Sequence, residues 1–339
     1  MAAARKAAPA KKIRIHFEND PALSPVFELT PRRVLDAVKR NPAVAPLVDL
    51  SFGKGGRGFE RHMRDADVLF AWRFDHRGIR RIAPRMRWIH IHGAGVEHLR
   101  PFDRWLPAGA RLTNSRGVHG ERANEYFLMA LLMLNNHVPA MASNQKQKRW
   151  RQLFNTNIIG KTVLIVGVGN MGGGAAEYAR RVGMKVIGIR RSGKPHPSVD
   201  RMYRTKDLDR VIPQADFVML SLPLTSETEG SFGKRQIALM KRGAGLVNVG
   251  RAGVLDHVAL EKALRSGRLS GAIIDVVPRE PLAPSSRLWS VPNLLITPHS
   301  SSDDQDYYTP RSLDMFFANV LRFHAGKPLA NQVDLALEY

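Results

Sequence analysis

The stretch Thr162–Gly172, TVLIVGVGNMG, decides the fold of this chain. Its first part, Thr162–Val166, is β-branched or apolar throughout and predicts a buried strand. That strand runs directly into three closely spaced glycines, Gly167, Gly169 and Gly172. A strand that ends in such a turn and continues into a helix is the frame that binds the pyrophosphate of a dinucleotide. The stretch therefore predicts a nucleotide-binding unit of a parallel sheet.

Each glycine of the turn has a separate task. Gly167 permits the tight turn, Gly169 lets the backbone approach a pyrophosphate, and Gly172 allows close packing of the helix on the strand. The pyrophosphate is expected at the helix N-terminus, where free N–H groups and the helix dipole favour anions. We therefore expect Asn170 and Met171 to bind the cofactor together with the three glycines.

Strand and helix patterns alternate on both sides of this turn. The expected strands are 13–17, 66–72, 86–91, 111–114, 162–166, 185–189, 217–222, 245–249, 271–276 and 294–296. Helices are expected at 31–40, 120–137, 260–266 and 308–324, with a connector at 143–157. Strands that alternate with helices predict an α/β fold whose parallel sheets are covered on both faces.

Composition excludes several classes of protein. A chain of 339 residues suits two domains. No segment approaches the roughly 18 to 20 apolar residues of a membrane span. The absence of cysteine excludes disulfides, thiolate zinc sites and cysteine nucleophiles, and it fits a cytoplasmic protein. No metal site is expected, and residues 1–12 are expected to form a disordered tail.

The net charge of +22 would attract carboxylate substrates, cofactor phosphates or nucleic acid. The basic residues are scattered, and no zinc finger, RNA-recognition signature or basic heptad segment is present. A solvated basic surface is therefore favoured over a nucleic-acid-binding face.

The end of the strand 185–189 predicts which dinucleotide binds. A site for NAD usually has an acidic residue there, which accepts from the ribose 2′-OH. This chain instead has Arg190, Arg191 and Ser192, and it has no acidic residue between Glu177 and Asp200. Arginine binds a 2′-phosphate through paired charge-assisted hydrogen bonds. We expect NADP(H) to be preferred, with NAD(H) possible if these arginines only share the general basicity of the chain.

Three polar segments follow the ends of later strands, at the edge where open α/β sheets bind ligands. They contain Arg251, Glu280 and His299. Arginine can hold a carboxylate and polarise a carbonyl, and histidine can deliver a proton near neutral pH. A carboxylate beside the histidine favours the imidazolium and fixes the orientation of the ring. Each residue alone has an ordinary structural explanation, but together they suit hydride transfer to a 2-oxo acid.

These segments resemble those of the D-isomer-specific 2-hydroxyacid dehydrogenases, especially the branch of glyoxylate and hydroxypyruvate reductases. The matching motifs are Asn248–Gly253, Gly271–Asp275, Glu280–Leu282 and Thr297–His299, preceded by Leu222–Thr225. The resemblance implies that Arg251, Glu280 and His299 are catalytic. It also implies that Pro223, Asn248, Val249 and Asp275 bind the cofactor, with Asp275 facing the nicotinamide carboxamide.

The resemblance further implies two doubly wound domains. A flavodoxin-like substrate domain is expected to comprise 1–118 and 303–339, with an inserted Rossmann dinucleotide-binding domain at 119–302. Relatives bind the substrate carboxylate on a glycine turn, here Gly93, Ala94, Gly95 and Val96, while His92 is expected to be only a neighbour. Trp72 and Arg73 follow another strand end and are expected to line the pocket, against ordinary packing of Trp72 and solvation of Arg73. A homodimer is also implied.

The function that follows is hydride transfer between NADP(H) and a small 2-oxo or 2-hydroxy acid of D configuration. Some relatives use the same fold as a dinucleotide-sensing corepressor or scaffold while they retain the three catalytic residues, so that alternative stays open. The sequence does not distinguish glyoxylate and hydroxypyruvate from bulkier 2-oxo acids.

Overall fold

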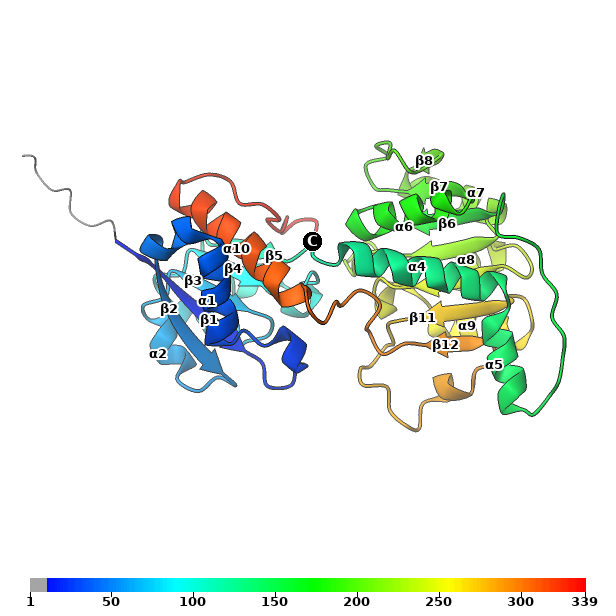
Figure 1. Ribbon diagram of the computed structural model, residues 1–339, viewed down its shortest axis with the longest axis horizontal. Helices are drawn as coiled ribbons and strands as arrows, with labels where there is room; N and C mark the ends of the chain where they lie inside the picture. The colour runs from blue at the N-terminus through cyan, green and yellow to red at the C-terminus, as the bar shows by residue number, and fades with distance from the viewer. Residues whose placement is uncertain (1–10) are drawn as a thin grey trace, which may run out of the picture. The chain divides into compact units, whose positions relative to one another are not determined.

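The computed structural model describes residues 11–339 and divides the chain into two compact units (Figure 1). Unit 1 comprises the described residues up to Val118 together with Asp304–Tyr339, and unit 2 comprises His119–Asp303. Most of the segment 1–12 that was expected to be a disordered tail lies outside the described residues.

Unit 1 is built on a five-stranded parallel sheet in the order β2-β1-β3-β4-β5. Its strands are β1 (Ile13–Asn19), β2 (Val48–Lys54), β3 (Val68–Ala71), β4 (Trp88–Ile91) and β5 (Arg111–Asn114). Strand β2 was not predicted, because it is an edge strand in which only Val48 is buried and the apolar pattern is weak.

Helices cover both faces of this sheet. One face packs on α1 (Pro31–Arg40) and α10 (Tyr308–His324), which lie side by side in Figure 1. The other face packs on the short helices α2 (Phe59–Met63) and α3 (Ile79–Ile82). Helix α10 is the tail helix expected from the sequence, and its aromatic face, with Phe316 and Phe317, belongs to the core of unit 1.

Unit 2 contains a seven-stranded parallel sheet in the order β12-β11-β10-β9-β6-β7-β8. Its strands are β6 (Thr162–Val166), β7 (Lys185–Ile189), β8 (Arg201–Tyr203), β9 (Phe217–Leu220), β10 (Gly245–Asn248), β11 (Gly271–Ile274) and β12 (Leu294–Ile296). Strand β8 was not predicted from the sequence, because it is an edge strand of only three residues. Within residues 11–339 no helix has both the length and the apolar character that crossing a membrane requires.

Successive residues of β6 alternate between two hydrophobic cores. Val163 and Ile165 face a core shared with α4 (Gly120–Asn135) and α6 (Asn170–Arg181), and α5 (Val138–Lys146) packs at the edge of this layer. Leu164 and Val166 face the core beneath α7 (Leu208–Val211), α8 (Lys234–Leu239) and α9 (His257–Arg265). The predicted fold class, α/β with doubly wound parallel sheets, is therefore confirmed.

Helix α6 contains two further glycines, of which Gly174 faces α4 and Gly173 faces the loop after β7. A Cβ at Gly174 would lie 2.1 Å from Asn124 Oδ1 of α4, and a Cβ at Gly173 would lie 2.7 Å from His196 Nε2. The two glycines therefore give room to side chains that lie against the first half of α6.

Strand β6 marks the point where the winding of unit 2 reverses. It lies between β7 and β9, so the chain proceeds to one side of β6 first and then returns to build the other side. Ligands of open α/β sheets bind at the carboxyl ends of the strands at such a point. The glycine turn after β6 is therefore placed where a dinucleotide site is expected.

Candidate functional site

The turn after β6 has the geometry that its three glycines require. Gly167 has a φ of +106°, which side-chain-bearing residues rarely adopt. A Cβ at Gly172 would lie 2.2 Å from the carbonyl oxygen of Gly167, so only glycine lets α6 pack this closely on the turn. A Cβ at Gly169 would meet no described residue within 4 Å apart from its neighbours in the chain. This open approach to the backbone fits a pyrophosphate.

The start of α6 adds backbone donors to this turn. Gly169 is the N-cap of the helix, and Asn170 and Met171 are its first two residues. The first N–H groups of a helix have no partner within the helix, and the helix dipole adds partial positive charge there. Because Gly169 and Asn170 are exposed, these donors can reach an anionic ligand.

The loop between β7 and β8 concentrates positive charge at the same edge of the sheet. Arg190, Arg191 and Ser192 follow β7 directly, and the N–H of Arg190 donates to the carbonyl of Tyr203 over 3.0 Å. The stem of Arg204 lies against Gly193, since a Cβ there would come within 2.9 Å of Arg204 Cγ. Sequence reasoning missed Arg204, because the short strand β8 that positions it carries almost no signal.

The acidic residue nearest to these arginines along the loop is Asp200, and its carboxylate is hydrogen-bonded at the amino end of β7. Asp200 accepts from the N–H of Val186 over 2.7 Å and pairs with Arg180 at 3.2 Å. It therefore does not oppose the arginines that follow β7.

Asn248 ends β10 and shapes the turn that presents Arg251. Its buried side chain accepts from the N–H of Gly250 over 3.2 Å and donates to the carbonyl of Arg251 over 3.3 Å. Val249 continues the ladder by donating its N–H to Leu220. The loop after β9 is fixed as well, since the carbonyl of Pro223 accepts from Thr228 Oγ1.

Glu280 and His299 form a hydrogen-bonded pair. His299 Nδ1 lies 2.7 Å from Glu280 Oε2, and Glu280 Oε1 accepts from the N–H of Val277 over 3.2 Å. The side chain of His299 is 44% exposed and that of Glu280 is 39% exposed, so both are accessible to a ligand. Because Glu280 accepts a hydrogen bond from the Nδ1–H of the ring, Nε2 remains available for proton transfer.

Asp275 lies directly after β11 and holds the loop that carries His299. Only 1% of it is exposed, and its carboxylate accepts from Thr297 Oγ1 at 2.5 Å and from the N–H groups of Ser300 at 3.0 Å and Ser301 at 3.1 Å. The N–H of His299 donates to the Asp275 carbonyl over 2.9 Å. Four hydrogen bonds to one residue therefore fix the 297–301 loop.

Glu280 and His299 shift each other's pKa in the directions that keep both groups charged. The hydrogen bond to Glu280 raises the pKa of His299 above its ordinary value and outweighs both burial and the positive charge of Arg251. Burial acts to raise the pKa of Glu280, but the hydrogen bond and charge of His299 outweigh it and lower that pKa. The imidazolium–carboxylate form of the pair is therefore favoured.

Two further titratable residues lie beside this pair, and sequence reasoning did not identify them. Burial, together with the charges of Arg251 and His299, lowers the pKa of His119 to about 4. Burial raises the pKa of Asp303 to about 6, against the opposing charge of His299. The two side chains lie 3.6 Å apart, between His119 Nδ1 and Asp303 Oδ1. No local motif marks them, because their pKa shifts arise mainly from burial and from charged residues distant in sequence.

The residues expected to bind substrate lie in unit 1, at the carboxyl ends of β3 and β4. The indole of Trp72 packs on the turn, 3.0 Å from where a Cβ of Gly93 would be, whereas Arg73 is exposed. The carbonyl of Ala94 accepts from Asn114 Nδ2 over 2.7 Å. Gly95 is half-buried and Val96 is buried behind the turn. Trp72 and Gly93 are therefore in direct contact.

A cavity of about 120 Å³ lies beside this turn, and Trp72, Phe27 and His92 are among the residues that line it. His92 is 1% exposed, and its buried Nε2 has no hydrogen-bond partner among residues 11–339. Burial lowers the pKa of His92 to about 3, so the ring is neutral at physiological pH. His92 was expected to be only a neighbour of the turn, but a buried ring nitrogen without a partner among residues 11–339, at a cavity, suits a ligand contact.

Comparison with known proteins places this site in a family. Residues 128–301 match the profile described as "D-isomer specific 2-hydroxyacid dehydrogenase, NAD binding domain". The glyoxylate reductase of Aeropyrum pernix is 29% identical over 282 residues, which cover 80% of this chain and 84% of that protein. Glyoxylate/hydroxypyruvate reductase B of Pectobacterium carotovorum is 31% identical over 227 residues, covering 65% and 70% of the two chains.

Solved structures show the same likeness over almost the whole chain. A D-isomer specific 2-hydroxyacid dehydrogenase of Xanthobacter autotrophicus, in complex with NADPH and MES, is 28% identical with a TM-score of 0.82. An NADPH-dependent glyoxylate/hydroxypyruvate reductase of Sinorhizobium meliloti, in complex with NADP and sulfate, is 27% identical with a TM-score of 0.80. Each comparison covers 97% of this chain and 100% of the other.

The ion pair of Glu280 and His299 makes a prediction that can be measured without substrate. Replacement of Glu280 with Gln removes the carboxylate that raises the pKa of His299, so that pKa should fall. An NMR titration of the His299 ring would measure the change. Glu177→Gln, which removes a carboxylate paired with Arg181 on α6, is the matched control and should leave the pKa of His299 where it is. An unchanged value in Glu280→Gln would contradict the assignment.

Proposed function

The chain belongs to the D-isomer-specific 2-hydroxyacid dehydrogenases, a family of oxidoreductases, and we propose that it reduces glyoxylate- or hydroxypyruvate-type 2-oxo acids with NADP(H). The observation that carries the proposal is the 2.7 Å pair of His299 and Glu280, whose pKa values favour the imidazolium, beside Arg251. The named relatives supply the substrate class, and the arginines after β7 support the choice of cofactor.

Reduction of a 2-oxo acid requires a hydride at the carbonyl carbon and a proton at the carbonyl oxygen. The bound nicotinamide supplies the hydride. In our proposal His299 donates the proton, and its raised pKa favours the protonated ring that this role requires. Arg251 holds the carboxylate and polarises the carbonyl, since its guanidinium is always charged and binds paired oxygens. Glu280 stabilises the imidazolium before the proton leaves.

The pH dependence of reduction follows from this role. The active form of His299 is protonated, so turnover in the reducing direction should be present below its pKa and decline as the pH rises through that value. Because Glu280 raises the pKa, it extends the active range to higher pH. Oxidation requires the neutral ring and should show the opposite dependence.

Asp275 has a second task in the proposed enzyme besides holding the 297–301 loop. Its Oδ1 accepts from Thr297 and Ser300, whereas its Oδ2 accepts from Ser301. A carboxylate oxygen can accept two hydrogen bonds, so Oδ2 retains capacity for one more donor. We propose that this donor is the nicotinamide carboxamide, and that Pro223, Asn248 and Val249 contact the same cofactor.

The preferred cofactor in this proposal is NADP(H). Arg190, Arg191 and Ser192 would bind the 2′-phosphate, and the stem of Arg204 lies against the same loop. Two of the similar solved structures were determined with NADP or NADPH. An arginine fork suits a phosphate, whereas the ribose 2′-OH of NAD would find no carboxylate directly after β7, where Arg190 and Arg191 stand.

The cofactor proposal predicts a change of preference on double substitution. Arg190→Gln with Arg191→Gln removes two charged donors, and each such bond contributes about 1.5–3 kcal/mol. The ratio of kcat/KM with NADPH to that with NADH should therefore fall by about tenfold or more. The control Lys234→Gln with Arg242→Gln removes the same charge from exposed positions elsewhere in unit 2 and should leave the ratio unchanged. A wild-type preference for NADH would refute the proposal.

The function as a whole is tested by a panel of 2-oxo acids with NADPH and with NADH. Steady reduction of glyoxylate or hydroxypyruvate is expected, and His299→Ala should lower kcat by at least about a hundredfold, the usual contribution of a general acid. Binding of NADPH, measured by fluorescence titration, should survive in that variant. Turnover that is absent with every acid of the panel, or unaffected in His299→Ala, would reject the proposal.

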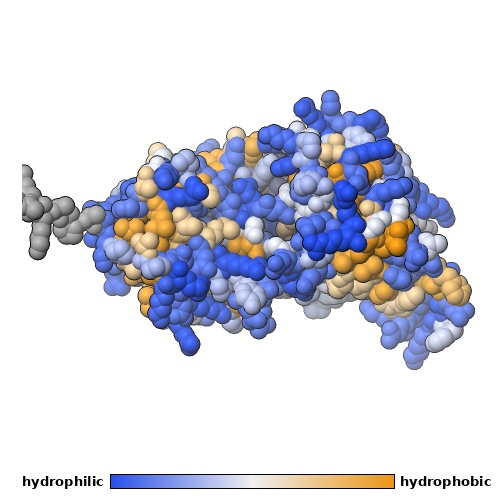
Figure 2. Space-filling model, turned by 45° about the horizontal axis from the view of Figure 1, so that its top comes forward, coloured by the Kyte–Doolittle hydropathy of each residue, from blue (hydrophilic) through white to orange (hydrophobic). Residues whose placement is uncertain are grey.

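A homodimer formed through unit 2 is the assembly we propose. The segment after α5 exposes Trp150, Phe154 and Ile159, with Trp150 95% and Phe154 83% exposed. Met141 of α5 is exposed as well. Figure 2 shows that hydrophobic residues (orange) gather between hydrophilic ones (blue) on parts of the face that it draws. Large apolar side chains exposed in one segment are typical of an interface between chains.

Removal of this apolar surface should therefore produce monomers. Trp150→Ser with Phe154→Ser is expected to shift the mass measured by light scattering from two chains to one. Trp289→Ser is the matched control, because Trp289 is also an exposed tryptophan of unit 2 but lies outside this segment. A wild-type protein that is monomeric at micromolar concentration would overturn the assembly.

A further inference from the structure

A large hollow in unit 1 lies at the opposite edge of the sheet from the substrate turn. It encloses about 600 Å³, beside the last turn of α10. Ile13 begins β1, Asp67 immediately precedes β3, and Arg87 immediately precedes β4. The hollow therefore opens at the amino ends of these strands. Trp72 and Gly93 follow the carboxyl ends of β3 and β4, so the two places are separate.

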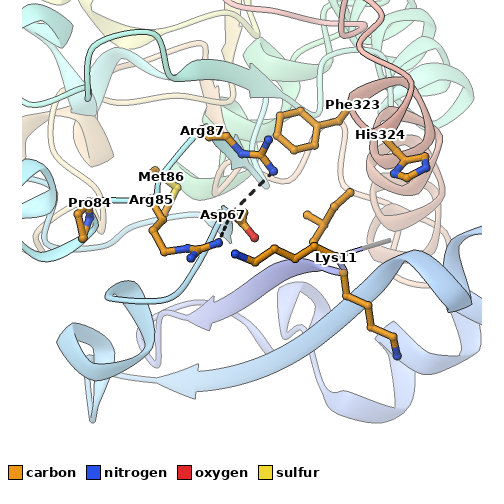
Figure 3. A pocket seen from close by; sticks show the side chains of 10 residues that line it. Lys11, Asp67, Pro84, Arg85, Met86, Arg87, Phe323 and His324 are labelled. Carbon is orange, nitrogen blue, oxygen red and sulfur yellow. Dashed lines mark hydrogen bonds and ion pairs between the residues drawn. The ribbon is translucent and has the colours of Figure 1, made fainter. Parts of the chain in front are cut away.

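Positive charge exceeds negative charge in this hollow. Its lining contains four cationic side chains, Lys11, Lys12, Arg85 and Arg87, against the single carboxylate of Asp67, with His324 at the margin. In Figure 3 the two arginines converge on Asp67. A concave surface lined by one sign of charge focuses the electrostatic field and attracts counter-ions.

Asp67 does not neutralise this charge, because its carboxylate already has a structural task. It is 5% exposed, and its Oδ2 accepts from the N–H of Arg14 over 3.0 Å. Its Oδ1 is shared by Arg85 at 3.3 Å and Arg87 at 3.8 Å. One carboxylate thus serves two guanidinium groups and a backbone donor.

Two comparable aspartates in unit 2 each pair with a single basic side chain, in contrast to the several cationic side chains around Asp67. Asp200 accepts from the N–H of Val186 on the neighbouring strand and pairs with Arg180, and Asp216 accepts from the N–H of Thr162 and pairs with Lys241. Each lies immediately before a strand, as Asp67 does. The cations around Asp67 therefore exceed what anchoring a strand requires.

The two arginines are held in place and retain capacity for a ligand. The guanidinium of Arg87 lies 4.7 Å from the ring centre of Phe323, a cation–π contact that fixes its orientation. The Nε of Arg85 is buried and has no hydrogen-bond partner among residues 11–339. The side chain of Arg85 is 35% exposed and that of Arg87 is 59% exposed, so their remaining N–H groups are accessible to an anionic ligand.

We propose that this pocket binds a small polyanion that carries phosphate groups. Planar arginine forks match phosphate oxygens, and the lysines add charge without demanding a fixed geometry. The volume of about 600 Å³ lies in the range of pockets for small molecules, so a phosphate-bearing metabolite fits better than a single ion. The ligand is distinct from the substrate and cofactor of the proposed reaction.

Isothermal titration of the full chain with inorganic pyrophosphate, at about 0.1 M salt, tests the proposal. Arg87→Gln should weaken binding by about tenfold, the effect of one lost charged hydrogen bond. Arg87 is 59% exposed, so the variant should fold, and an unchanged affinity for NADPH would show that unit 2 is intact. Arg242→Gln, which removes one exposed arginine of unit 2, should bind pyrophosphate as the wild type does.

A second variant and a second anion make the result decisive. Lys11→Ala with Lys12→Ala removes two lining charges without touching Asp67 and should also weaken pyrophosphate binding. Citrate, a carboxylate of similar charge, should bind more weakly than pyrophosphate. Pyrophosphate binding that is equal in Arg87→Gln and the wild type would place the anion at the dinucleotide turn or on the general basic surface and overturn the proposal. Equal affinity for citrate would overturn the assignment to phosphate.

Discussion

The position of His299 depends on the burial of one carboxylate. Asp275 is 1% exposed, and an unpaired charge in that position would cost several kcal/mol. The chain meets this requirement by closing the 297–301 loop over it, so that three donors of that loop reach the carboxylate. The closure holds His299 at a φ of +52°, a backbone conformation that costs a non-glycine residue about 1–3 kcal/mol. The hydrogen bonds to Asp275 outweigh that strain.

The same constraint extends from the loop into the helical layer of unit 2. Thr297 has one hydroxyl proton, which it donates to Asp275, so Tyr126 of α4 must donate to Thr297 over their 2.7 Å contact. On the neighbouring strand the amide of Asn248 fixes the turn that carries Arg251. A buried polar residue at the end of each strand therefore orients the reactive side chain that follows it. The side chains of Glu280 and His299 themselves remain accessible.

How much the sequence could predict follows from where each constraint lies. The tasks of Gly167 and Gly172 are local backbone requirements, so the motif alone predicted them. Strand β2 and Arg204 were missed because edge strands carry little apolar pattern. The shifted pKa values of His119 and Asp303 arise from burial, which depends on residues distant in sequence. The anchoring task of Asp275 was missed for the same reason, since its donors come from another strand end.

The distribution of acidic residues connects the site to the basic composition of the chain. Asp67, Asp200 and Asp216 lie at the amino ends of strands, where each accepts a backbone N–H from a neighbouring strand and pairs with basic side chains. No acidic residue lies between Glu177 and Asp200, the stretch that contains Arg190 and Arg191. Three carboxylates thus fix the amino edges of the sheets, whereas the arginines that we propose to bind the cofactor follow the carboxyl end of β7. The pocket around Asp67 differs from the surroundings of Asp200 and Asp216 because cations outnumber the acid there, and our proposal of an anion site rests on that local imbalance rather than on the total charge.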